Sequence, residues 1–264
     1  MKKVLVLLIG VSLVSCGLKQ EKEIEDDSGN KVSENTVEPA KPEDTEFYEP
    51  IPPIVNPIGK NGVPSDAIVL FDGENLESWV QAKDGSPAKW HLNEDGSMTV
   101  KNKSGDIKTK QNFGSVQLHI EWKSPVDVEG ENQHRANSGV FLQNRYEVQV
   151  LDNNHNNTYV NGQVGSIYKQ SVPLVNASVP TGEWNTYDII FHQPEFNEQG
   201  EIIKKATITV LQNGVLIQDH FEILGSTAYI GHPKYEKHGK APLSLQDHGD
   251  NSRVSYRNIW IRAL

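Results

Sequence analysis

Short runs in which apolar and polar residues alternate recur from about residue 63 to the C-terminus, and this period of two is typical of half-buried β-strands. Groups rich in glycine, asparagine and aspartate separate the runs and predict turns. No segment after the first sixteen residues keeps a helical period over three turns. The runs are AIVLF, SMTV, SVQLHIEW, SGVFL, YEVQVL, TYDIIF, KATITVLQNG and VSYRNIWIRAL. We therefore predict one all-β domain at residues 61–264, a β-sandwich or jelly roll of antiparallel strands.

Two stretches predict β-hairpins. In LQNGVLIQD, Asn213-Gly214 suits a type I′ turn between alternating strands. The stretch 137–152, NSGVFLQNRYEVQVLD, predicts two strands around a turn at Asn144–Arg145. Alternation gives this second hairpin an apolar face of Val140, Leu142, Tyr146, Val148 and Val150, and an opposite face of Phe141, Gln143, Glu147 and Gln149.

Acids and bases also alternate on another strand, because LHIEW carries His119 and Glu121 on one face. For a single strand, an exposed polar face is the simpler interpretation. The presence of several such strands predicts a sheet face that collects acids, bases and amides from distant parts of the chain.

The first sixteen residues predict a bacterial lipoprotein signal peptide. Lys2 and Lys3 precede a short apolar run, and Leu13-Val14-Ser15-Cys16 fits a lipoprotein cleavage box. Cys16, the single cysteine of the chain, is therefore expected to carry the lipid that anchors the mature protein to the membrane of the cell envelope, here the outer membrane. Without a second cysteine, no intrachain disulfide can form, and stability must come from packing.

Residues 17–60 predict a disordered tether. The segment is acidic and then rich in proline, with no sustained apolar period, so it cannot bury enough surface to offset its ordering entropy. The chain has a formal net charge of −10 and no basic stripe, which argues against a nucleic-acid partner. It also lacks a P-loop, a GxGxxG segment before a helix, a GxSxG elbow and an HExxH motif.

Further candidate groups stand near turns. The loop GENQHRANSG contributes His134, Arg135 and Asn137, and GSIY contributes Tyr168, whose hydroxyl could equally be a buried group bonded to backbone. LSLQDHGD places Gln246, Asp247, His248 and Asp250 directly after an apolar strand. An aspartate beside a histidine can fix its tautomer or raise its basicity, although a simple turn has the same composition. Arg257 interrupts a strand that otherwise suits the core, so its guanidinium needs a partner such as Glu147, Asp247 or a substrate oxygen.

The order and spacing of many runs give a resemblance to a known family. IVLFDGENLESW, LHIEW, ANSGVFL, YEVQVLD, NGQVGSIY, PLVNAS, GEWNTYDI, TVLQNG, and LQDHG followed by YRNIWIR are similar to the 3-keto-disaccharide hydrolase domains, a family formerly of unknown function. The resemblance covers about Ile68 to the C-terminus. It implies a concanavalin-like jelly roll, a carbohydrate substrate and, as a functional partner, a sugar 3-dehydrogenase that supplies the ketone. Ala136 stands where the family pattern has glycine.

The resemblance also implies a reaction. A ketone at C3 acidifies the C2 proton, so a base can remove it, the C1 substituent leaves by elimination, and water adds to the double bond. The hypothetical roles are His248 or Glu147 as base, His119 or Glu121 as acid, and Arg135 or Arg257 on the enolate oxygen. Binding roles are expected for Asn137, Gln149, Tyr168, Gln246 and Asp247. No cofactor is certain, but a divalent metal on His119, Glu121 and His248 is an option.

Two other functions stay open at this stage. A conventional glycosidase would use Glu121 and Glu147 as its two carboxylates and would cleave unoxidised glycosides. A non-catalytic, surface glycan-binding lipoprotein would need only aromatic and amide contacts, and sandwich lectins share the predicted fold.

Overall fold

The computed structural model describes residues 19–25, 31–37, 41–59 and 62–264, which fall into two units divided after Ile54. In the first unit, β1 (Lys19–Glu25) pairs antiparallel with β2 (Lys31–Val37), and the short 3-10 helix η1 (Pro42–Thr45) follows. The segment predicted as a tether thus includes this pair of strands, while residues 46–54 are exposed and irregular. The predicted signal peptide and Cys16 lie outside the described residues. No described helix is long and apolar enough to cross a membrane.

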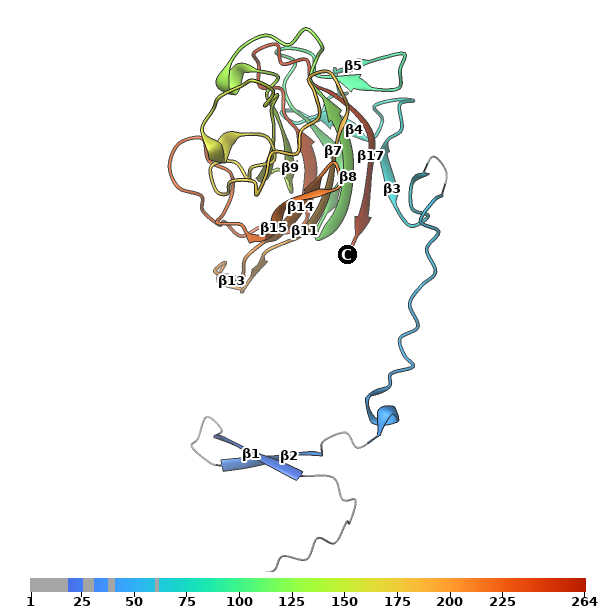
Figure 1. Ribbon diagram of the computed structural model, residues 1–264, viewed down its shortest axis with the longest axis vertical. Coiled ribbons are helices and arrows are strands. Elements are labelled where there is room, and N and C mark those ends of the chain that lie inside the picture. Colours follow the sequence, from blue (N-terminus) through green and yellow to red (C-terminus); the bar gives the residue numbers. More distant parts are fainter. Residues whose placement is uncertain (1–18, 26–30, 38–40, 60–61) are drawn as a thin grey trace, which may run out of the picture. The chain divides into compact units, whose positions relative to one another are not determined.

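Two large antiparallel sheets make up most of the second unit (Figure 1). The five-stranded sheet has the order β10 (Tyr146–Val150), β9 (Ser138–Leu142), β16 (Ala241–Leu245), β7 (Ile107–Phe113) and β4 (Trp79–Gln81). The eight-stranded sheet has the order β15 (Val215–Glu222), β14 (Thr207–Gln212), β11 (Asn185–His192), β8 (Val116–Lys123), β17 (Ser255–Ala263), β6 (Met98–Thr99) and β5 (His91–Leu92), and β3 (Ile68–Phe71) pairs with β17. A small ribbon joins β12 (Glu195–Phe196) to β13 (Ile202–Lys204). The all-β antiparallel prediction is confirmed.

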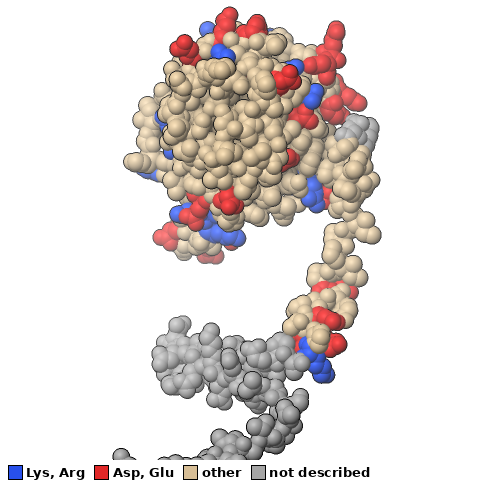
Figure 2. Space-filling view, in the orientation of Figure 1, with Lys and Arg blue, Asp and Glu red and all other residues tan. Residues whose placement is uncertain are grey.

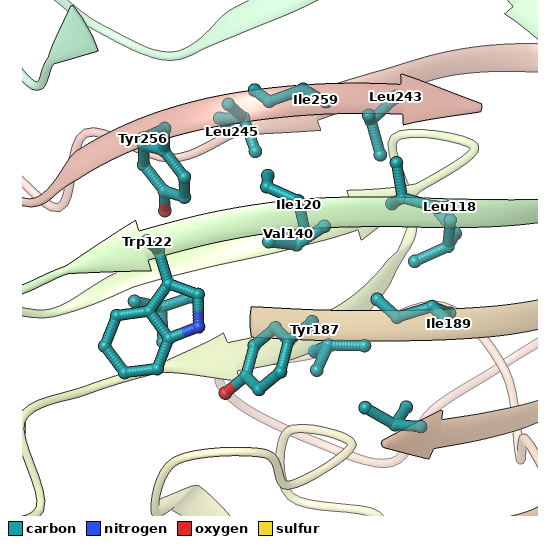
Figure 3. Close-up of a cluster of buried hydrophobic side chains, with 14 of the residues drawn as sticks. Leu118, Ile120, Trp122, Val140, Tyr187, Ile189, Leu243, Leu245, Tyr256 and Ile259 are labelled. Atoms are coloured by element: carbon teal, nitrogen blue, oxygen red, sulfur yellow. The ribbon is translucent and has the colours of Figure 1, made fainter. Parts of the chain in front are cut away.

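The core lies between the two sheets. On β8, residues Leu118, Ile120 and Trp122 are buried while the alternate residues are only partly covered, as the period of two requires. Figure 3 shows these side chains packed among others from both sheets: Val140, Tyr187, Ile189, Leu243, Leu245, Tyr256 and Ile259. The apolar face predicted for the second hairpin, Val140 to Val150, is entirely buried in this core.

The two predicted hairpins differ in accuracy. Asn213 and Gly214 join β14 to β15 with φ of 53° and 78°, as a type I′ turn requires. The loop between β9 and β10 has three residues, Gln143 to Arg145, and not the predicted two. Gln143 (φ 52°) therefore leaves the polar strand face and donates its amide to the Phe113 carbonyl on β7.

Loops cover the outer face of the five-stranded sheet beside β10. Residues 165–168 run along this strand, with Gly165 N–H donating to Gln149 O and Tyr168 N–H donating to Glu147 O. On the hairpin loop, Thr227 N–H donates to Arg145 O. In Figure 1 these coils, with the short 3-10 helices η3 (Asn132–His134) and η4 (Val160–Gly162), gather on one side of the domain. This arrangement turns an open sheet face into a walled cavity.

Candidate functional site

A cavity of about 500 Å³ lies on that covered face. The sheet side supplies Asn137, Phe141, Glu147, Gln149, Gln246 and His248. The covering segments supply Gln133, His134, Tyr159, Tyr168, Lys169, Thr227 and Tyr229. The lining is therefore polar and aromatic, which suits a carbohydrate better than an apolar ligand. A larger cavity of about 590 Å³ beside β13 and β15 has no buried side chain in its lining.

Glu147 is the most deeply buried titratable group of this cavity, with 4% of its surface exposed. Alternation on β10 directs Tyr146 and Val148 into the core and Glu147 to the opposite face. Within the described chain, its carboxylate has no hydrogen-bond or ion-pair partner. Burial, together with the negative charge of Asp106, raises the pKa of Glu147 to about 8. Gly139 makes room for it, because a Cβ there would lie 2.6 Å from Glu147 Oε1.

Asp250 joins two histidines at the cavity wall. His248 Nδ1 lies 2.7 Å from Oδ2 of Asp250, and His134 Nδ1 lies 3.3 Å from the same oxygen. Burial would raise the pKa of Asp250, but the hydrogen bonds from His248 and His134 outweigh it and lower that pKa. The carboxylate therefore stays ionised and fixes the orientation of the His248 ring.

Side-chain amides form a network across the floor of the cavity. Gln149 Nε2 donates to Gln133 Oε1 at 3.1 Å, and Asn137 Nδ2 donates to the Gln133 carbonyl at 2.7 Å. In the described chain, the Oε1 atoms of Gln149 and Gln246 are buried without a partner. Such amides are ready to accept hydrogen bonds from sugar hydroxyls.

Tyrosines and one lysine form the opposite wall. The hydroxyls of Tyr159 and Tyr168 are 2.7 Å apart, and burial raises the pKa of both. Lys169 Nζ donates to the Tyr229 carbonyl at 2.7 Å and lies 4.4 Å from the centroid of its ring. This wall combines aromatic faces with a positive charge.

His119, Glu121 and Arg257, predicted to share this site, lie elsewhere. They are on β8 and β17, on the outer face of the eight-stranded sheet. With Asp188 and Asn258 they form a group that we call the β8 cluster. Since the core separates the outer faces of the two sheets, the predicted single polar face is wrong, and His119, Glu121 and His248 cannot share a metal.

The β8 cluster is fully paired. His119 Nδ1 lies 2.7 Å from Asp188 Oδ1, Arg257 Nε donates to Glu121 Oε2 at 2.6 Å, and Asn258 Nδ2 donates to Glu121 Oε1 at 2.8 Å. Burial lowers the pKa of His119, but Asp188 and Glu121 outweigh it and raise this pKa to about 9. Burial likewise raises the pKa of Glu121, but His119, Asn258 and Arg257 outweigh it and hold the value at about 2.

Two other predicted contacts are structural. Arg135 Nε donates to Asp152 Oδ1 at 3.4 Å, so its guanidinium binds a carboxylate outside the cavity lining. Asp247 accepts from the N–H groups of Gly105 and Gly249, which fixes a turn and keeps it out of the lining. The cavity does bring together six of the residues that were given a catalytic or binding role, Glu147, His248, Asn137, Gln149, Tyr168 and Gln246, and also the candidate His134.

Some cavity residues received no role from sequence reasoning. Asp250, beside the lining, was named as a candidate but given no role, although it stands two positions after His248. Tyr159, Lys169 and Tyr229 lie on loops with no strand period, and only the fold brings them together. As a whole, the cavity can transfer a proton through Glu147 and stabilise negative charge through Lys169 and the histidines.

Comparison with known proteins supports a carbohydrate-active domain. Residues 66–262 match the sequence profile of the 3-keto-alpha-glucoside-1,2-lyase-like domain. The crystal structure of an inferred glycosyl hydrolase from Parabacteroides distasonis ATCC 8503 is 54% identical, with a TM-score of 0.81 over 85% of this chain and 97% of that one. Two more inferred glycosyl hydrolases of that organism are 21% and 23% identical, with TM-scores of 0.57 and 0.52. Each alignment covers 75% of this chain, and the two cover 94% and 99% of the respective relatives. At these identities the likeness shows the fold alone. No match was found among curated proteins.

Proposed function

Because the chain belongs to the 3-keto-alpha-glucoside-1,2-lyase-like domain family, whose solved relatives include inferred glycosyl hydrolases, we propose that its cavity cleaves the glycosidic bond of a 3-keto glycoside. The observation that carries this proposal is the buried, unpaired carboxyl of Glu147 in a polar cavity. Such a group costs stability and is typical of a proton-transfer site.

Glu147 acts as the base in this mechanism. It takes the C2 proton, and the electrons form an enolate with the C3 ketone. The C1–oxygen bond then breaks as the leaving oxygen takes up the proton that Glu147 removed. Water adds its hydroxyl to C1 and a proton to C2, so the net reaction is hydrolysis. With a pKa of about 8, Glu147 is a much stronger base than an ordinary carboxylate, and roughly a tenth of it is ionised at pH 7.

The enolate oxygen needs positive charge or hydrogen-bond donors. Lys169 and the His134–His248 pair are the groups of the lining that supply them. The amides of Gln133, Asn137 and Gln149 are placed to bind sugar hydroxyls, and Tyr159 and Tyr229 offer faces for the ring.

The competing functions make different demands on the site. A two-carboxylate glycosidase built on Glu121 and Glu147 is not supported, because these residues lie on the outer faces of different sheets. A glycan-binding protein would use the same amides and tyrosines. It would not need a carboxyl group whose pKa is raised by burial to about 8.

The test uses the purified chain with a 3-keto glycoside and its unoxidised parent, and follows aglycone release. We expect cleavage of the keto form alone and its loss in the Glu147→Gln variant. The matched control is Glu121→Gln, a substitution of the same type outside the cavity, which should leave turnover intact. Cleavage of the parent would instead support a conventional glycosidase, and binding of either glycan without turnover would support a lectin-like protein.

Two further proposals concern the setting of this reaction. We propose that a separate oxidising enzyme, a sugar 3-dehydrogenase, supplies the ketone, since the proposed reaction starts from a sugar that is already oxidised at C3. We also propose that a lipid on Cys16 anchors the protein in the cell envelope, at the outer membrane. Labelling with a radioactive fatty acid in the wild type, and its loss in Cys16→Ala, would test this anchor.

A further inference from the structure

Three side chains at the cavity wall carry the donor atoms of a metal site. His134 ends η3, while His248 and Asp250 lie in the loop between β16 and β17. One ligand atom from each lies within 4.8 Å of the others, and in the described part of the chain no other group of three His, Cys, Asp or Glu side chains meets this criterion. Loops far apart in sequence thus converge on one point.

The hydrogen bonds within this group leave one carboxylate oxygen of Asp250 unpaired among the described residues. Oδ2 of Asp250 accepts from both imidazoles, but its Oδ1 is buried and has no partner among the described residues. Both imidazoles also point their Nδ1 atoms at the same oxygen of one carboxylate, which holds the two rings close together. A cation bound here would use the donor atoms that these hydrogen bonds already orient.

The nearby arginine does not oppose a cation with an unpaired charge. Arg253 lines an adjoining cavity of about 240 Å³ together with Glu129, His134 and Asp250. Its Nη1 lies 3.0 Å from both carboxylate oxygens of Asp127, so its charge is compensated. Glu129 and Asp250 are the carboxylates of this lining.

We propose that His134, His248 and Asp250 bind one divalent transition-metal cation at the edge of the cavity. Two imidazoles and one carboxylate suit Zn²⁺, Fe²⁺, Co²⁺ or Ni²⁺, whereas Ca²⁺ and Mg²⁺ prefer oxygen ligands. Ligand atoms about 2.1 Å from a metal lie roughly 3 to 3.5 Å apart. The Asp250 distances to His248 and His134, 2.7 and 3.3 Å, are already close to this range, so only the separation of the two imidazole ligand atoms, within 4.8 Å, would have to adjust. The side chain of His134 is 73% exposed and free to move, while that of Asp250 is 17% exposed and held in place.

Three protein ligands leave positions open for substrate, and His134 and His248 face the same cavity as Glu147. The cation would bind the C3 carbonyl oxygen and draw off the negative charge that develops when Glu147 removes the C2 proton. This role rests on the proposed function, but the binding of the metal does not.

The experiment is a calorimetric and spectroscopic titration of the chelator-treated chain with Co²⁺, without any sugar. We expect one equivalent to bind with a visible absorption band, and Asp250→Asn and His134→Ala each to weaken binding by about 10- to 100-fold. His91→Ala is the matched control, since it removes an exposed histidine on β5, in the other sheet. Because His134 is exposed, its alanine variant should fold even if Asp250→Asn does not.

Absence of stoichiometric binding, or binding equally strong in His134→Ala, would overturn the proposal. Turnover of a keto glycoside by metal-free protein that Co²⁺ does not increase would overturn the role of the cation while leaving the proposed function intact. Stoichiometric binding that depends on His134 and Asp250, with no turnover of the keto glycoside, would support the site and contradict the proposed function.

Discussion

Each sheet carries titratable side chains on the face turned away from the core, but the two groups are paired differently. In the β8 cluster, Glu121 accepts from Arg257 and Asn258, and His119 is bound to Asp188 and stacked on Trp260 at 5.1 Å between ring centroids. In the cavity, Glu147 has no partner within the described chain. Pairing moves the pKa of Glu121 down to about 2 and burial moves that of Glu147 up to about 8.

The difference in pairing distinguishes a structural carboxylate, Glu121, from one that can take part in proton transfer, Glu147. A charge that is fully paired stays in one protonation state across the physiological range, so it stabilises the fold and cannot exchange protons readily. A buried carboxyl without a partner costs stability and changes its protonation state near neutral pH. We infer that the lack of a partner, more than residue type or strand position, marks Glu147 as the group that transfers protons.

The largest expected effect is on turnover in Glu147→Gln. Loss of the base should lower kcat/KM for a keto glycoside by about 10³- to 10⁴-fold, whereas Glu121→Gln should change it less than about fivefold. Steady-state kinetics at saturating and limiting substrate would measure both. An equal loss of kcat/KM in the two variants would show that the presence or absence of a partner does not determine which glutamate is needed for turnover.

The next effect concerns stability at alkaline pH. The folded pKa of Glu147, about 8, exceeds the usual 4.5, so the native state binds the proton more tightly than the unfolded state. Stability from this group is therefore present at low pH and is lost as pH rises from about 4.5 to 8. Glu147→Gln should abolish this loss and make the variant more stable by up to about 5 kcal/mol at pH 9, with little difference near pH 4.5. Urea unfolding at the two pH values tests this, and a constant difference would contradict it.

Removing Glu121 from the β8 cluster should lower the stability of the fold, whereas Glu147→Gln should raise it. Glu121→Ala leaves Arg257 and Asn258 without their acceptor, removes one of the two carboxylates beside His119, and should cost about 2 to 3 kcal/mol at pH 7. Because the pKa of Glu121 is lowered, its contribution is present above pH 4.5 and is lost as pH falls toward 2. The difference from wild type should thus shrink at pH 3. Glu222→Ala, which breaks an exposed pair with Lys205, is the control and should have a much smaller effect.

The sequence predicted the fold well, because alternation reports directly which residues enter the core. The prediction failed where the result depends on which sheet a strand joins, or where the apolar alternation of a strand is weak. Parity assigns His119 and Glu147 each to a polar strand face, but it does not say which sheet each strand joins. β7, IKTKQNF, was missed because its lysines hide the apolar positions. The sequence alone does not distinguish the roles of Asp247 and Asp250. With the turn at Gly249 (φ 78°), Asp247 accepts a hydrogen bond from the backbone, while Asp250 binds the ring of His248.

The smallest expected effect comes from a paired group inside the cavity itself. Tyr159 and Tyr168 share a hydrogen bond of 2.7 Å, so Tyr159→Phe removes a satisfied interaction and leaves Tyr168 able to bond to substrate or water. If pairing is what matters, this variant should lose less than about 1 kcal/mol of stability and less than about fivefold in kcat/KM, despite lining the same cavity as Glu147. Kinetics and urea unfolding measured beside Glu147→Gln would decide. A loss in turnover near 10³-fold would mean that the tyrosine pair takes part in proton transfer, and that location in the cavity outweighs pairing.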